Sequence, residues 1–291
     1  MINSIKFFAI ALIFSSLYFT KVYAQKEDKS LLYEISGNGL SKPSYIFGTI
    51  HVICKDEFFM PQVVKDKFAT TEQVYLELDM DDPSMMTEMQ KSMMMTDGKT
   101  LKSIMSEADY QKVATFFKDS LKTNIAMMNS FKPFVLSSMT IPVMLGCPMQ
   151  GYEEVFVKLA KEQNKEIKGL EMVKEQFDAI DNMGMEKQAQ LMLVKMVDNW
   201  TKGKMEMKTM IKNYRNQDIE ALLKDMANAS TADANFEKDL LENRNRNWIP
   251  RIDAIVKTKP TFFGVGAGHL GGKTGVLALL KKQGYTVKAI K

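Results

Sequence analysis

The chain contains only two histidines in 291 residues, and both end the same kind of four-residue phrase, Gly48-Thr-Ile-His51 and Gly266-Ala-Gly-His269. Each phrase follows a short apolar run, at 44–47 and at 261–265, that predicts a β-strand. Glycine three residues before each histidine fits a sharp exit from a strand, where a Cβ would restrict the backbone. Histidine is the commonest metal ligand and titrates nearest to neutral pH. Two histidines in matching contexts therefore predict one shared site.

Two glutamates occupy similar places in the sequence. Glu77 lies at the end of the predicted strand 74–78, and Glu171 directly follows the predicted strand 166–170. Two histidines with one or two carboxylates form a ligand set suited to Zn, Mn, Co or Fe(II). Such a metal polarises a carbonyl group and lowers the pKa of bound water to about 7, and a carboxylate that is not a ligand can take the proton. The alternative for either glutamate is a structural, salt-bridged role, because an unpaired buried carboxylate is costly.

Arginine is scarce, and three of the four arginines, Arg244, Arg246 and Arg251, cluster just before the last predicted site strand. A guanidinium group binds a carboxylate or an oxyanion with two parallel hydrogen bonds, which lysine cannot do. We predict this role for Arg244, with Asn245 as a neighbouring substrate-binding residue. The alternative is that the arginines lie on a helix surface or pair with acids such as Glu242.

Residues 1–24 predict a secretory signal peptide. Lys6 supplies a positive charge, residues 7–19 are apolar, and Ala24 is a small residue at the expected cleavage point. The rival interpretation, an uncleaved membrane anchor, is disfavoured because the apolar run is short for about 30 Å of hydrocarbon. We therefore expect an exported protein, periplasmic or secreted, with no membrane contact after cleavage.

Charge and cysteine content narrow the class of protein further. Residues 25–291 carry a net charge near +2, with lysines interspersed among acids, which is not typical of nucleic-acid binding. Cys54 and Cys147 make an even count, and in an oxidising compartment this predicts a disulfide bond. Such a bond would tie the loop of the first histidine to the segment around Cys147. Two buried free thiols are the alternative.

Predicted strands lie near both ends of the chain, and helices dominate between them. We expect an α+β fold: a compact mixed sheet formed from both chain ends, with a large helical insertion at about 82–258. The matching half-sites also raise the prospect of an internal pseudo-duplication. The expected elements are a hairpin of 31–36 with 44–50, a helix over 61–68, a helix opened by Ser106, one apolar helix between Ser130 and Gly146, a helix over 274–283 and a strand over 285–290. Residues 25–291 are expected to form a single domain.

Seven methionines fall between Met80 and Met95. Their spacing at 85, 86, 89 and 93 follows one face of a helix, which predicts a core or an adaptable groove. A methionine-lined groove suits extended peptides of varied sequence. The alternative is a Cu(I) site built from thioethers.

The glycine-rich segment near the C-terminus matches two nucleotide-binding patterns only superficially. Gly266 to Gly271 fits G-x-G-x-x-G, but no acid follows about 20 residues later. Ala267 to Thr274 has alanine where a phosphate-binding loop begins with glycine. Both interpretations are disfavoured.

Several phrases, in this order along the chain, resemble the TraB/GumN family, which includes the Tiki proteases that cleave Wnt proteins. The phrases are Tyr45-Ile-Phe-Gly-Thr-Ile-His51, Tyr75-Leu-Glu77, Gly169-Leu-Glu171, Leu241-Glu-Asn-Arg244-Asn-Arg-Asn-Trp248, Gly264-Val-Gly-Ala-Gly-His269 and Gly284-Tyr285. The resemblance implies a metal-dependent hydrolase, in Tiki a peptidase that uses manganese or cobalt. It also implies a fold related to erythromycin esterase and ChaN.

The leading hypothesis is an exported metallohydrolase, a peptidase, acting on a peptide or protein substrate. A divalent ion (Mn, Co or Zn) would be held by His51, His269, Glu77 and Glu171, with Arg244 as a further catalytic residue. The second hypothesis is a non-catalytic protein of the same fold that binds metal, haem or peptide. A third is a scaffold for partner proteins whose histidines only hydrogen-bond in the core.

Overall fold

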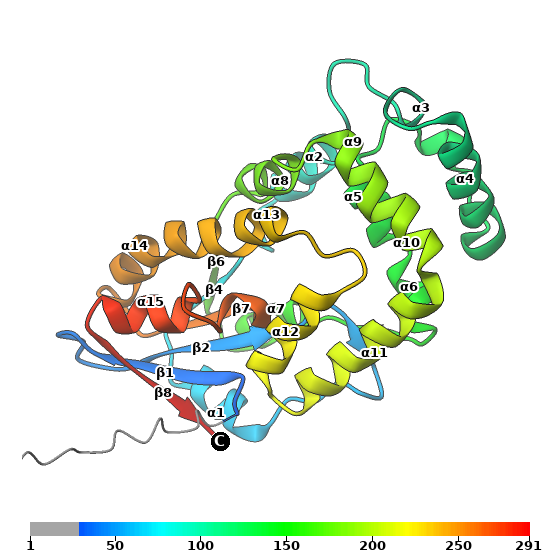
Figure 1. The fold of residues 1–291 in the computed structure, drawn as a ribbon. Coiled ribbons are helices and arrows are strands. Elements are labelled where there is room, and N and C mark those ends of the chain that lie inside the picture. The colour runs from blue at the N-terminus through cyan, green and yellow to red at the C-terminus, as the bar shows by residue number, and fades with distance from the viewer. Residues whose placement is uncertain (1–28) are drawn as a thin grey trace, which may run out of the picture.

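The two ends of the chain meet in one mixed sheet of six strands (Figure 1). The computed structural model describes residues 29–291, and the predicted signal peptide lies outside them. The strands stand in the order β6-β4-β7-β2-β1-β8. Their bounds are β1 Leu32–Gly37, β2 Ser44–Thr49, β4 Gln73–Leu76, β6 Glu166–Gly169, β7 Thr261–Gly266 and β8 Tyr285–Ile290. A separate small ladder pairs β3 Ile53–Cys54 with β5 Met149–Gln150.

The four strands β6, β4, β7 and β2 are parallel, so their carboxyl ends share one edge of the sheet. Strand β1 pairs antiparallel with β2, and β8 pairs antiparallel with β1 at the edge of the sheet. Every residue of β2 is buried, as are the first five of β7, as expected for central strands covered on both faces. The predicted α+β fold, with a sheet from both chain ends, is confirmed. The sheet also receives β6 from the middle of the chain.

Helices fill the chain between the strands, and none formed by residues 29–291 is long and apolar enough to span a membrane. The α-helices are α1 Gln62–Ala69, α2 Met85–Ser92, α3 Leu101–Ile104, α4 Glu107–Leu121, α5 Pro133–Ser138, α6 Ile141–Leu145, α7 Tyr152–Glu162, α8 Val173–Asp181, α9 Met185–Gln188, α10 Lys195–Asp198, α11 Trp200–Arg215, α12 Ile219–Asn228, α13 Ala234–Glu237, α14 Arg244–Val256 and α15 Val276–Lys282. Single-turn 3₁₀ segments are η1 Ile125–Met128 and η4 Ala267–His269, and π-helical segments are η2 Ala189–Val194 and η3 Lys238–Asn243.

Two main hydrophobic cores support these elements, beside a small third cluster of Leu78, Val173 and Phe177. The larger surrounds the sheet and includes Phe47, Phe156 and Phe262, whose rings contact one another. The smaller joins α3, α4, α5 and η2 around Val113 and Phe117. Figure 1 shows α3 and α4 at the end of the molecule away from the sheet. The helical insertion therefore carries a core of its own.

The apolar helix predicted between Ser130 and Gly146 is divided into α5 and α6. Pro142 lies in the first turn of α6, where its missing amide hydrogen is tolerated, but it could not continue a helix begun at Pro133. Gly146 ends α6 in the left-handed conformation, at φ 67°. The predicted end is confirmed, and the single helix is wrong.

The structure contains the expected Cys54–Cys147 disulfide, which closes a loop across 93 residues. It lies beside the β3–β5 ladder, in which Cys54 pairs with Met149. The loop that carries His51 is thereby fastened to the segment that leads into α7.

Replacing both cysteines, Cys54→Ser with Cys147→Ser, should lower the free energy of unfolding by about 2–5 kcal/mol, because the unfolded chain gains conformational freedom. Guanidinium unfolding followed by tryptophan fluorescence measures this change. The wild-type protein unfolded with reductant is the control and should match the double variant. An unchanged unfolding midpoint would show that the bond does not stabilise the fold.

Candidate active site

Glutamate and histidine side chains converge at the carboxyl edge of the parallel strands. Glu77 directly follows β4, Glu171 comes two residues after β6, and His269 closes the turn η4 after β7. All three are buried. Glu77 Oε1 lies 3.9 Å from His269 Nε2. The parallel register of the sheet thus brings together three residues that span nearly 200 positions of sequence.

Arg244 occupies the centre of this group, and its guanidinium is 6 % exposed. Nη2 donates to Glu77 Oε2 and to Glu171 Oε1, both at 2.6 Å. Nε donates to both oxygens of Glu171 at 3.1 Å. Nη1 donates to the Leu240 carbonyl at 2.8 Å and lies 3.0 Å from His269 Nε2. Every N–H group of the guanidinium therefore has a partner.

The chain before Arg244 explains how its side chain reaches this position. The π-helical segment η3 leads directly into α14, whose first residue is Arg244. Such segments are frequent at functional sites, because they alter the hydrogen-bond ladder and the direction of the side chains. Trp248 follows Arg244 by one turn of the helix, so its indole ring lies on the same side. The guanidinium carbon of Arg244 lies over this ring, 4.9 Å from the ring centre.

Glu171 is held from several sides. Trp248 Nε1 donates to its Oε2 at 3.0 Å, and Gln176 Nε2 lies 3.2 Å from its Oε1. The same Gln176 nitrogen lies 3.1 Å from Glu77 Oε2 and so bridges the two carboxylates. Burial raises the pKa of Glu171, opposed by its bonds to Arg244. Glu171 thus anchors the guanidinium.

Glu77 is the more acidic of the two carboxyl groups. Burial alone would raise its pKa, but the cationic groups around it, Arg244 among them, and the Gly266 amide bring the pKa down to about 2. The Gly266 N–H donates to Glu77 Oε1 at 2.7 Å. Glu77 is therefore an anion at neutral pH.

The glycines of the two histidine phrases, Gly48 and Gly266, allow neighbouring groups to lie close to the backbone. Neither Gly48 nor Gly266 has a positive φ, so the predicted need for unusual backbone freedom is wrong. A Cβ on Gly266 would lie 3.2 Å from Glu77 Oε1. A Cβ on Gly48 would lie 2.8 Å from the Leu270 side chain and 3.1 Å from Ala267. Both positions therefore favour glycine for reasons of space.

His269 is buried, and its imidazole is neutral at neutral pH. Its Nδ1 lies 2.7 Å from Asn245 Oδ1, while Asn245 Nδ2 donates to the Thr274 carbonyl at 3.0 Å. This orientation of the amide assigns the proton to Nδ1 and leaves a lone pair on Nε2. Burial lowers the pKa of His269 to about 3. Asn245, predicted to bind substrate, uses both ends of its amide within the protein.

His51 differs sharply in its surroundings. Its side chain is 71 % exposed, and its Nδ1 lies 3.3 Å from Glu153 Oε1. This hydrogen bond raises the pKa of His51 to about 9. The structure therefore places the two histidines at different depths, one inside the charged cluster and one at its opening.

An apolar cavity of about 320 Å³ connects the two histidines. His51, Glu77, Arg244 and His269 line it, together with apolar side chains that include Met226 and Leu241. A second cavity, of about 400 Å³, shares His51 and Glu77 with the first. Met80, Met89 and Met93 line this second cavity. The methionine-rich segment 80–95, which includes α2, therefore borders a cavity next to the site.

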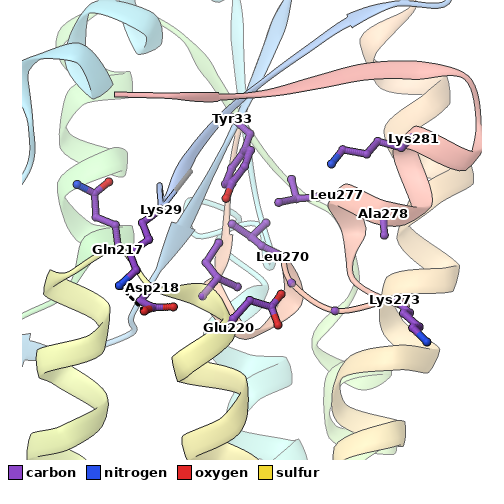
Figure 2. A pocket seen from close by; sticks show the side chains of 13 residues that line it. Lys29, Tyr33, Gln217, Asp218, Glu220, Leu270, Lys273, Leu277, Ala278 and Lys281 are labelled. Atoms are coloured by element: carbon purple, nitrogen blue, oxygen red, sulfur yellow. Dashed lines mark ion pairs between the residues drawn. The ribbon is translucent and has the colours of Figure 1, made fainter. Parts of the chain in front are cut away.

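The glycine-rich segment after His269 lines a different cavity, of about 360 Å³, between β1, α12 and α15 (Figure 2). Gly271, Gly272 and Lys273 belong to it, as does Lys29, which pairs with Asp218 at 2.7 Å. None of the predicted site residues lines this cavity.

Four contributions to the site were not predicted: Gln176, Glu153, the Trp248 side chain and the Gly266 amide. Trp248 lies one turn after Arg244 in the phrase quoted above, so a helical reading of that phrase would have found it. Gln176 and Glu153 carry no local signal, because only the tertiary fold brings them to their partners.

Comparison with known proteins identifies the family of the chain. The model of the TraB/PrgY/gumN family matches residues 31–289. The chain belongs to the TraB/PrgY/gumN family. It is 21 % identical to "Metalloprotease TIKI2" of Danio rerio and 22 % identical to "Metalloprotease TIKI1" of Homo sapiens, over 92 % and 91 % of this chain. The "Metalloprotease TIKI homolog" of Nematostella vectensis is 21 % identical over 86 %.

The chain spans 62–65 % of the length of these relatives. No solved structure matches it. The resemblance to the TraB/GumN family is thus confirmed. The named relatives show that the chain is distantly similar to metalloproteases.

Arg244→Met should lower the free energy of unfolding by about 3–5 kcal/mol, because it leaves two buried carboxylates without their cation. Arg246→Met, on the same helix, is the matched control. Arg246 is 56 % exposed and pairs only with Glu242, so its loss should cost at most about 1 kcal/mol. Urea unfolding of the two variants measures both values. Equal losses would contradict the central role of Arg244.

Neither histidine should titrate between about pH 5 and pH 8, because the pKa of His51 is about 9 and that of His269 is about 3. Folding holds His269 neutral, so its contribution to stability is present above pH 6.5 and is lost as the pH falls toward 3. The contribution of His51 to stability depends on pH in the opposite direction: it is present below pH 6.5 and is lost as the pH rises through about 9. NMR of the two imidazole rings, assigned with His51→Ala, measures both values. A ring that titrates with a midpoint near pH 6.5 would show that this histidine does not have the surroundings described for it.

Proposed function

We propose that this protein is an exported hydrolase that cleaves peptide bonds at the Arg244 cluster. One observation carries the proposal: Glu77, Glu171, Arg244 and His269 are buried together, and three of them, Glu77, Arg244 and His269, line an apolar cavity. Burying several ionisable groups is a poor way to stabilise a fold, so such a cluster at a cavity favours a functional role. An apolar cavity with a few convergent polar groups is typical of a substrate site.

The name of the curated relatives implies a metal cofactor, and the donor set of this site suits one. Among residues 29–291 no group of three or more His, Cys, Asp or Glu side chains is preassembled around an ion position. In the structure Arg244 Nη1 lies 3.0 Å from Nε2 of His269, the ring nitrogen that would bind an ion. The tautomer of His269, however, is the one found in metal-ligating histidines, with the far ring nitrogen tied to an oxygen.

We propose that His51, His269 and Glu77 would hold a divalent ion of Mn, Co or Zn. Two histidines and one glutamate form the ligand set of several zinc peptidases. When bound, such an ion would polarise the substrate carbonyl and acidify a water molecule. Glu171 does not line the histidine cavity, so we assign it to holding Arg244 rather than to the ion.

The residues of the chain have distinct tasks in this proposal. With Nε2 of His269 bound to an ion, the Nη1 hydrogen of Arg244 would be free to donate to the carbonyl oxygen of the substrate, where a fixed cation stabilises developing negative charge. Glu171 and Trp248 would keep the guanidinium in place during this exchange. Asn245 holds the proton on His269 Nδ1. The apolar walls would exclude water from the substrate backbone.

Export is part of the proposal. The predicted signal peptide and the Cys54–Cys147 disulfide both favour an oxidising compartment. The substrate would therefore be a peptide or protein in the periplasm or outside the cell.

Manganese or cobalt should bind to the chelator-treated protein and support cleavage of a peptide library. His51→Ala and His269→Gln should each abolish both effects, because each removes a ligand, while Arg246→Met should retain them. Elemental analysis and mass spectrometry of the peptides are the measurements. Unchanged metal stoichiometry in both histidine variants would refute the ligand assignment. A loaded protein that cleaves neither peptides nor esters would favour the non-catalytic alternative.

A further inference from the structure

We propose that Glu153 is the positioning residue of His51: its carboxylate accepts a hydrogen bond from Nδ1 and so presents Nε2 to the cavity. This inference rests on the proposed function, since it concerns how one histidine of that site is oriented. Glu153 lies in the first turn of α7, about 100 residues after His51, and was not among the predicted site residues.

Glu153 itself is held firmly. Its side chain is 16 % exposed, in contrast to the exposed imidazole that it contacts. The hydroxyl of Thr49, the last residue of β2, donates to Glu153 Oε1 at 2.7 Å. His51 Nδ1 lies 3.3 Å from the same oxygen. A single carboxylate oxygen therefore joins the end of β2 to the imidazole two residues later.

The start of α7 is built to bring this carboxylate near the histidine loop. Gly151 precedes the helix, and a Cβ there would lie 3.1 Å from the His51 carbonyl oxygen. The β3–β5 ladder and the Cys54–Cys147 disulfide fasten the same two segments together. The N-terminal turn of a helix also favours an acidic side chain, through its exposed N–H groups. The close approach at Gly151, the ladder and the disulfide thus all hold the start of α7 against the loop of His51.

The second histidine shows the same design with a different partner. Asn245 Oδ1 lies 2.7 Å from Nδ1 of His269 and leaves the lone pair on Nε2, which Arg244 Nη1 contacts at 3.0 Å beside the cavity. Glu153 does for His51 what Asn245 does for His269. A side-chain oxygen on Nδ1 in each case selects the tautomer that can bind an ion through Nε2. This correspondence explains why an exposed histidine would nevertheless be oriented.

Glu153→Ala tests the inference, with Glu154→Ala as the matched control. Glu154 is the exposed neighbour in the same helical turn, and its carboxylate lies 3.5 Å from Gln150 Nε2. The first measurement is the tautomer of the metal-free protein, read by ¹⁵N NMR at about pH 10, above the pKa of His51. We expect the proton to move from Nδ1 to Nε2 in Glu153→Ala and to stay on Nδ1 in the wild type and in Glu154→Ala.

The second measurement is the affinity for Mn²⁺ by calorimetry. We expect Glu153→Ala to weaken binding by about 10- to 100-fold, the usual effect of losing the outer partner of a ligand, and Glu154→Ala to leave it unchanged. Thr49→Val, which removes only the hydroxyl that fixes Glu153, should give a smaller effect in the same direction. If Glu153→Ala fails to fold, Thr49→Val takes its place in both measurements.

The two proposals fail in different ways. If the proton of His51 stays on Nδ1 in Glu153→Ala, or if Glu154→Ala has the same effect, the positioning role is overturned. If the wild type binds no Mn²⁺ and cleaves no peptide, the proposed function falls. The tautomer measurement in the metal-free protein still decides the role of Glu153 in that case.

Discussion

The site depends on one buried cation. Arg244 donates to two carboxylates that arrive from neighbouring parallel strands, and without it Glu77 and Glu171 would face each other as like charges in a buried region. The guanidinium is also the group that contacts His269. Its rigid fork satisfies all of these partners at once, which a lysine ammonium could not do. Both carboxylates and the buried imidazole of the cluster are thus in contact with this one side chain.

The sheet provides the order that this interaction requires. Strands β6, β4 and β7 are adjacent and parallel, so the residues that follow them must emerge at one edge. The Gly266 N–H donates to Glu77 at 2.7 Å, and the absence of a Cβ, which would lie 3.2 Å from the same oxygen, gives the carboxylate room. Helix α14 then crosses this edge and supplies Arg244, Asn245 and Trp248 from one short stretch of chain. A cluster of residues from four distant segments is thus produced by simple topology.

The sequence allowed the sheet, its two chain ends and most of the cluster to be predicted. Periodicity and glycine positions indicated the strands, and the scarcity of histidine and arginine indicated which residues to examine. The roles were harder to predict, because they depend on partners. Asn245 looked like a substrate ligand, but its amide is satisfied by His269 and Thr274. Glu153 could not be found, since it meets His51 only through the packing of α7.

The matching histidine phrases also mislead in one respect, because similar local sequence did not produce similar environments. Both follow parallel strands that pair directly, with Gly48 opposite Val265 and Thr49 opposite Gly266. After His269 the chain continues under α12 and α14, and Met226 lies close to Gly268, so the imidazole is sealed. After His51 the chain turns outward to the disulfide, and nothing comparable covers the ring. Burial then makes one imidazole neutral, while Glu153 favours the charged form of the other. In the proposed function, a substrate would enter from the side of the exposed His51 and reach the buried Arg244 cluster through the cavity that both histidines line.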